Sequence, residues 1–151
     1  IVEIYNQAII AGFRTADTKT VTVFDRKKWF ESHIPNRYPI FVAESDNHVT
    51  GYLSISPYRP GRMALRYTAE VSYYVHDKHQ RQGIASNLMQ FAVDKCPSLA
   101  IKTLFAILID NNTASCKLLE KFGFTKWGHM PGVADYDGVE AGHLYYGLRI
   151  K

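Results

Sequence analysis

The segment from His76 to Ser86 combines residue types that could bind an anion. It reads His-Asp-Lys-His-Gln-Arg-Gln-Gly-Ile-Ala-Ser, and the pattern of a strand precedes it while that of a helix follows. The first turn of a helix leaves several backbone N–H groups without partners, and the helix dipole adds partial positive charge there. Gly83 and Ala85 keep the side chains small enough for a phosphate to approach these groups. The segment therefore predicts a phosphate-binding site.

The elements that position this segment follow from the hydrophobic pattern around it. Glu70 to Val75 alternates in the period of a strand, and a helix with one apolar face runs from Ile84 until Cys96-Pro97-Ser98 ends it. Thr103 to Ile109 is an apolar run short enough for a buried strand. A strand, a crossover helix and a second strand form a βαβ unit, so the two strands should be parallel.

The remaining elements can be placed in the same way. Asp25 is the expected N-cap of an early helix anchored by Trp29 and Phe30, and Asn112 is the expected N-cap of a late one. We also expect a first helix near Val2 to Ile9, a hairpin of Tyr38 to Glu44 with Val49 to Ile55, and final strands at Phe124 to Met130 and His143 to Ile150 that are separated by a loop at Val133 to Gly142.

Length and composition restrict the class of protein. The 151 residues fit one domain, 1–151, and a net charge of +4 suits an anionic ligand without requiring nucleic acid. Arg59, Arg62 and Arg66 alternate with tyrosines in a manner that could stack on RNA, but we prefer a loop between strands. Cys96 and Cys116 lack the spacing of metal ligands and predict no metal and a cytoplasmic, reducing location. No apolar run predicts a membrane span or a signal peptide.

Two motifs in this chain resemble those of one enzyme family. Gln80-Arg81-Gln82-Gly83-Ile84-Ala85 is similar to the pyrophosphate loop of the Gcn5-related N-acetyltransferases (GNAT superfamily). The segment from Asn112 through Ser115 to Phe124 resembles the second signature of that family. Six further features spread over nearly the whole chain resemble the phosphinothricin and methionine sulfoximine acetyltransferases, and these are Tyr5-Asn6, Phe13-Arg14-Thr15, Trp29-Phe30, Pro57-Tyr58-Arg59-Pro60, Glu70-x-x-x-Tyr74-Val75 and His143. The resemblance implies a GNAT fold of α/β (α+β) class, with a mixed, mostly antiparallel twisted sheet flanked by helices and a central parallel βαβ unit.

The resemblance also implies what each residue would do. Acetyl-CoA would be the cosubstrate, and the expected residues around it are Tyr74, Val75, Gln80, Arg81, Gln82, Gly83, Ile84, Ala85, Ser86, Asn112 and Ser115. Glu70 would be the general base, with His143 as a second candidate. Leu119 replaces the tyrosine with which many relatives protonate the departing thiolate, and leucine has no proton to donate.

The acceptor implied is the primary amine of a small amino acid analogue. Arg59 and Arg66 are the candidates for binding its carboxylate, and Phe13 is the candidate for an apolar wall. Two alternatives stay open, a protein N-terminus as acceptor and a non-catalytic sensor that binds acyl-CoA. Members of this family form homodimers, so a homodimer is expected. A first strand that the family places before the helix at Val2 is expected to be missing from this sequence.

Overall fold

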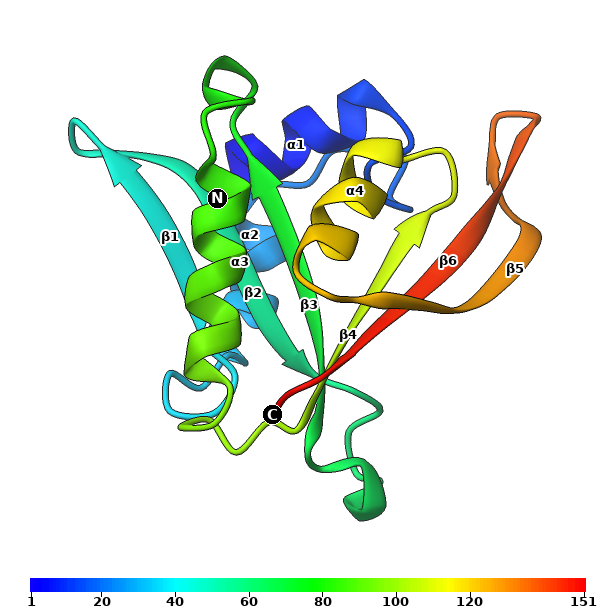
Figure 1. Cartoon of the computed structure of the whole chain (residues 1–151). Helices are drawn as coiled ribbons and strands as arrows, with labels where there is room; N and C mark the ends of the chain where they lie inside the picture. Colours follow the sequence, from blue (N-terminus) through cyan, green and yellow to red (C-terminus); the bar gives the residue numbers. More distant parts are fainter.

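The computed structural model describes all residues from 1 to 151 as a mixed sheet flanked by four helices (Figure 1). The six strands lie in the order β1-β2-β3-β4-β6-β5. Their bounds are β1 (Ile40–Ser45), β2 (His48–Pro57), β3 (Thr68–Val75), β4 (Thr103–Ile109), β5 (Thr125–Tyr136) and β6 (Val139–Arg149). The helices are α1 (Val2–Ala11), α2 (Val23–Glu31), α3 (Ile84–Lys95) and α4 (Thr113–Lys121), with short 3-10 turns at Met63–Leu65 and Asp77–His79. None of the helices is long and apolar enough to cross a membrane.

The centre of the sheet is a parallel pair that separates along its length. β3 and β4 pair only at Thr68 with Thr103, Ala69 with Leu104 and Glu70 with Phe105, and every other strand pair is antiparallel. Beyond Glu70 the two strands diverge, which gives the sheet the V shape of Figure 1. The predicted mixed, mostly antiparallel sheet with a central parallel pair is confirmed.

The two faces of the sheet carry different helices. α3 and α4 lie on one face, where a core of buried side chains joins them to the strands, and α1 and α2 lie behind the sheet on the other (Figure 1). Met89 of α3 and Leu119 of α4 are fully buried in this core. On the other face the Tyr5 ring of α1 packs edge-on against Tyr74, with 5.1 Å between ring centroids. Each residue of β3 therefore faces one helical layer or the other.

Two of the expectations for the helix anchored by Trp29 are wrong. Thr22, not Asp25, is the N-cap of α2, and Asp25 is the third helical residue, whose carboxylate accepts hydrogen bonds from Thr22 in a capping box. Phe30, expected to be an apolar anchor of this helix, is 55% exposed. The sequence does contain the correct signal, because Thr22 and Asp25 have the three-residue spacing of a capping box, in which the first residue is the N-cap.

The segment expected to be a loop, Val133 to Gly142, is the end of a long hairpin. β5 runs on to Tyr136 and β6 starts at Val139, so only Asp137 and Gly138 form the turn. Both have positive φ, 53° for Asp137 and 92° for Gly138. An Asp-Gly pair favours this two-residue turn because the right-handed strand twist requires positive φ at both positions.

Packing of α3 on the sheet supplies a test of the fold. A Cβ added at Gly51 of β2 would lie 2.9 Å from Ile84 Cγ2 and 3.2 Å from the Tyr74 carbonyl oxygen. We expect Gly51→Ala to lower the free energy of unfolding by about 1–3 kcal/mol because the first turn of α3 must move away. The matched control is Gly128→Ala in β5, where the added Cβ has ordinary contacts of 3.8 Å and 3.9 Å with Tyr145. Urea titration of both variants checks this, and equal stabilities would contradict it.

Candidate active site

The loop before α3 presents an open anion-binding turn. Gly83 is the N-cap of α3 in the left-handed conformation, with φ of 82°, and no side chain caps the helix. Arg81 is also left-handed, with φ of 60°. A Cβ at Gly83 would meet no atom within 4 Å. The first turn of α3 therefore keeps its backbone N–H groups available beside open space, as phosphate binding requires.

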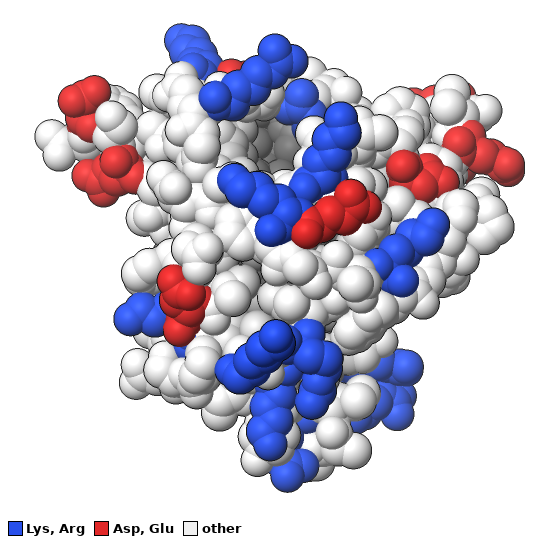
Figure 2. All heavy atoms as spheres, in the orientation of Figure 1, with Lys and Arg blue, Asp and Glu red and all other residues white.

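A first cavity of about 440 Å³ lies over this turn. Ten of the eleven residues predicted to bind acetyl-CoA line it, and these are Tyr74, Val75, Gln80, Arg81, Gly83, Ile84, Ala85, Ser86, Asn112 and Ser115. The exception is Gln82, whose side-chain amide donates instead to the carbonyl oxygen of Lys78, at 3.3 Å. Figure 2 shows a hollow among α1, α4 and the loop before α3, with basic side chains around it. This cavity suits an elongated anionic ligand.

Asn112 has a structural role alongside its place in the cavity wall. Its side-chain oxygen accepts a hydrogen bond from the backbone N–H of Ser115 at 3.3 Å, so it is the N-cap of α4, as predicted. The first turn of α4, with Ala114 and Ser115, therefore also lines the first cavity. Capping and lining are compatible roles for this residue.

A second cavity of about 400 Å³ lies on the other side of the opened sheet and contains both residues predicted to be catalytic. Its lining comes from both termini and the centre of the chain and comprises Tyr5, Arg14, Thr15, Ala16, Asp17, Arg26, Trp29, Ser54, Ser56, Glu70, Ser72, Tyr74, Ile107, Leu108, Ile109 and His143. Glu70 and His143 thus face one space from strands β3 and β6.

Glu70 has the environment of a base rather than of a structural anion. It lies at the last paired position of the β3–β4 ladder and is partly buried. No hydrogen bond or salt bridge engages its carboxylate, and burial raises its pKa above the ordinary value. A carboxylate with a raised pKa holds a proton more strongly, so it is a better proton acceptor near neutral pH.

Two cations line the second cavity that were not among the predicted site residues, Arg14 and Arg26. The Arg26 guanidinium lies over Trp29, 3.9 Å from the ring centroid, and over Tyr5 at 4.5 Å. Its Nε is buried without a hydrogen-bond partner in the protein. Asp17, also in the lining, accepts a hydrogen bond from the Tyr5 hydroxyl at 2.5 Å. Arg14 belongs to a segment that resembles the family, which could have marked it, whereas no local pattern marks Arg26 and Asp17, because only the packing of α1 and α2 brings them to β3.

The three residues predicted to bind the acceptor are not brought to this cavity. Phe13 packs against Tyr136, with ring centroids 4.4 Å apart, and is not in the lining. Arg59 and Arg66 belong to the loop between β2 and β3, where Arg66 donates to the Met63 carbonyl oxygen at 2.9 Å, and neither lines either cavity. In Figure 1 this loop lies at the bottom of the view, at the end of the sheet opposite the N-terminus of α3. Their role in acceptor binding stays a prediction.

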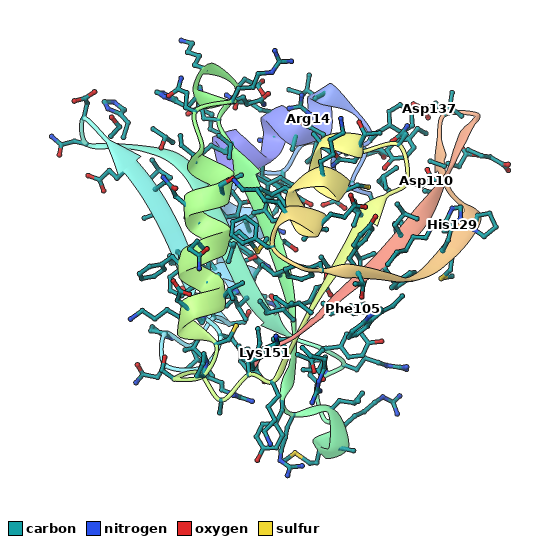
Figure 3. All side chains as sticks on the ribbon, viewed as in Figure 1. Arg14, Phe105, Asp110, His129, Asp137 and Lys151 are labelled. Atoms are coloured by element: carbon teal, nitrogen blue, oxygen red, sulfur yellow. The ribbon has the colours of Figure 1, made fainter.

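A third, small cavity of about 40 Å³ shares lining residues with both larger cavities, at the point where β3 and β4 separate. We call it the passage, and its walls include Tyr73, Ser115 and Leu119. Arg14 and Tyr74 line the passage and both cavities. Figure 3 shows Arg14 in the loop that follows α1, near α4. A ligand in the first cavity can thus extend toward Glu70 through the opened sheet.

This fold and site define a class of enzyme. Residues 3–124 match the model of the acetyltransferase (GNAT) family, and the chain belongs to that family. It is accordingly an acetyl-CoA-dependent acetyltransferase.

Several named proteins resemble the chain along most of its length. The "Putative phosphinothricin acetyltransferase YwnH" of Bacillus subtilis is 42% identical over 139 residues, which are 91% of this chain and 84% of that protein. The L-methionine sulfoximine/L-methionine sulfone acetyltransferase of Salmonella typhimurium is 34% identical and covers 88% of this chain and 77% of its own. A solved structure described as "yncA, a putative ACETYLTRANSFERASE from Salmonella typhimurium with its cofactor Acetyl-CoA" has a TM-score of 0.92 at 31% identity, covering 99% of this chain and 86% of that one.

The residues of the first cavity fit acetyl-CoA. Free backbone N–H groups at the start of α3 and the open space at Gly83 suit a pyrophosphate, and Tyr74 and Val75 extend along β3 toward the passage. No group of three or more His, Cys, Asp or Glu side chains is arranged to hold a metal ion.

Gly83→Val tests the anion-binding turn. The added side chain would project into the open space at the start of α3, so loss of even one phosphate contact should raise the acetyl-CoA KM about tenfold or more. Gly61→Val is the matched control, because Gly61 has nearly the same φ, 83°, and equal open space but lies in the loop before β3. Steady-state kinetics measure both variants. Equal values of KM would exclude Gly83 from the site.

Proposed function

We propose that the protein transfers the acetyl group of acetyl-CoA to the α-amine of a small amino acid analogue of the phosphinothricin or methionine sulfoximine type. The observation that carries the proposal is the second cavity, which places carboxylates and guanidinium groups around one space next to the passage from the first. An α-amino acid carries one positive and one negative group, so this lining complements it. The names of the relatives support the same class of acceptor.

Glu70 is proposed as the general base. An α-amine is mostly protonated at neutral pH and must lose a proton before its nitrogen can attack the thioester carbonyl carbon. Glu70 accepts this proton from the ammonium group, directly or through one water, and His143, in the lining of the same cavity, is the second candidate for it. The neutral nitrogen then attacks: the C–N bond forms, the C–S bond breaks with its electron pair on sulfur, and the second proton that nitrogen loses as it becomes an amide goes to the thiolate, which gives the thiol of CoA.

Arg26 and Arg14 are proposed to bind the carboxylate or phosphinate of the acceptor. Arg26 has an unpartnered buried Nε and a guanidinium fixed between two aromatic rings, so little conformational entropy is lost when it binds an anion. Arg14 lines the cavity and is held by an exposed ion pair with Asp77 at 3.3 Å. Arg59 and Arg66, the cations predicted from sequence, lack such a position within one chain.

Two rival functions have some support. A structure of a ribosomal-protein-alanine N-acetyltransferase from Brucella melitensis has a TM-score of 0.90 at 27% identity, covering 98% of this chain and 91% of that one, which favours a protein N-terminus as acceptor. A cavity of about 400 Å³ that presents charges of both signs suits a single amino acid better than a peptide. A non-catalytic acyl-CoA sensor is favoured by Leu119 alone, and Glu70 in the second cavity argues against it.

The homodimer and the cytoplasmic location expected from sequence stay predictions. Half-exposed apolar side chains on the β5–β6 hairpin, among them Trp127 and Val139, are compatible with a contact between chains. Both cysteines are free, which is compatible with a reducing compartment. Light scattering at working concentration would measure the oligomeric state.

An acceptor panel tests the proposed function. Acetyl transfer should be measured with methionine sulfoximine, phosphinothricin, a polyamine and a short peptide that carries a free N-terminus. We expect kcat/KM to be highest for the two amino acid analogues, and mass spectrometry should place the acetyl group on their α-amine. Activity on the peptide alone would replace this proposal with the first rival, and binding of acetyl-CoA without transfer to any acceptor would replace it with the second.

Glu70→Gln tests the base. The amide keeps the size of the side chain but cannot accept the proton, so kcat at neutral pH should fall by about 10²-fold or more. Because the pKa of Glu70 is raised, wild-type kcat/KM should decrease as pH falls through that pKa and the carboxylate becomes protonated. At high pH the deficit of the variant should shrink, since more amine arrives neutral.

The control for this variant is Glu44→Gln, which makes the same change at an exposed position of β1 outside both cavities. It should keep wild-type kinetics and pH dependence. Wild-type kcat at neutral pH in Glu70→Gln would reject Glu70 as the base, and His143 would then be the residue to replace.

A further inference from the structure

The hydroxyl of Tyr73 is a buried polar group that the proposed mechanism has not used. Alternation along β3 directs Glu70, Ser72 and Tyr74 toward the second cavity, and Tyr73 toward the opposite face and α4. The Tyr73 hydroxyl oxygen is inaccessible and has no hydrogen-bond partner in the protein. A buried hydroxyl without a partner is unfavourable, so a ligand atom that accepts a hydrogen bond from it would remove a cost already present.

The position of Tyr73 indicates which ligand atom that would be. Its side chain lines both the first cavity and the narrow passage, where the far end of a ligand lying in the first cavity would reach. Leu119, at the position of the tyrosine by which many relatives assist the departing thiolate, lines the same passage and is 1% exposed. The passage thus has a phenol on the β3 side, whereas α4 offers only the hydrocarbon of Leu119 at that one position and a serine hydroxyl, Ser115, one turn earlier.

We propose that the Tyr73 hydroxyl donates a hydrogen bond to the sulfur atom of CoA as the C–S bond breaks, a role that rests on the proposed acetyl transfer. Tyr73 would then be a catalytic residue supplied by β3 in place of one supplied by α4. The electron pair of the broken bond stays on sulfur, and the phenol keeps its proton throughout. A hydrogen bond to the developing thiolate is stronger than one to the neutral thioester, so it lowers the barrier.

The electrostatics of the passage agree with a donor that does not ionise. Burial raises the pKa of Tyr73 to about 12, far above the ordinary thiol pKa of about 8.5, so the proton remains on the phenol. Ser115 and Cys116 of α4 lie close enough to affect this pKa, although neither meets the geometry of a hydrogen bond with Tyr73. Arg14, the charged residue in the passage lining, would act on the same thiolate and is unchanged in the variants below.

The test measures the thiol of bound CoA directly. Thiolate absorbance is titrated in the complex with CoA, with desulfo-CoA as the blank, for wild type and Tyr73→Phe. Loss of the donor should raise the pKa of the bound thiol by about one unit or more, and kcat for acetyl transfer should fall about tenfold or more at nearly unchanged acetyl-CoA KM.

Tyr52→Phe is the matched control, since the Tyr52 hydroxyl is also buried and unpartnered but Tyr52 lines neither cavity nor the passage. Its bound CoA should show the wild-type thiol pKa.

The outcomes separate this inference from the proposed function. A thiol pKa and a kcat in Tyr73→Phe equal to those of wild type would overturn the role of Tyr73 and leave acetyl transfer intact. An equal rise of the thiol pKa in Tyr52→Phe would also overturn it, because the effect would not depend on position. If wild type transfers no acetyl group to any amine, the proposed function fails, and the thiol titration, which needs no acceptor, still decides whether Tyr73 contacts the sulfur.

Discussion

The short length of the β3–β4 ladder is the constraint on which the rest of the site depends. Parallel strands need a crossover, and here it is α3, so the N-terminus of that helix comes to lie beside the end of β3. Because pairing stops at Glu70 and Phe105, the facing backbone groups farther along have no partner strand. The same divergence opens the passage between the two cavities. Continued pairing to Val75 would close the sheet and separate the turn at Gly83 from Glu70.

The cofactor side of the site could be predicted because its determinants are local in sequence. The strand at Thr103–Ile109 and the start of α3 at Ile84 follow from hydrophobic period and glycine placement, and the structure has both at those bounds. The anion-binding turn needs only a strand, a small-residue loop and a helix N-terminus in succession. The residues of the turn and of the first turn of α3 follow from this local pattern, whereas Asn112 and Ser115 were expected only from the resemblance to the family, and both groups line the first cavity.

The acceptor side could not be predicted in the same way. Arg26 and Asp17 reach the second cavity only because α1 and α2 pack behind the sheet, and no short-range pattern encodes that packing. Arg59 and Arg66 were predicted to bind the acceptor carboxylate because they are close together in sequence. The loop that carries them lies at the end of the sheet away from the N-terminus of α3. The hairpin error was different, since Asp137-Gly138 is a strong turn signal that could have been recognised between the two strands.

Arg14 and Tyr74 are shared walls of both cavities and of the passage between them. Two ligands bound in these cavities would therefore contact common side chains, and an adjustment of the Tyr74 ring or the Arg14 guanidinium that improves one site would change the other. Their binding free energies would be coupled through these residues. Such a coupling is reciprocal, because each ligand then changes the affinity for the other by the same factor. Cooperativity between cosubstrates is in this way a property of the opened sheet itself.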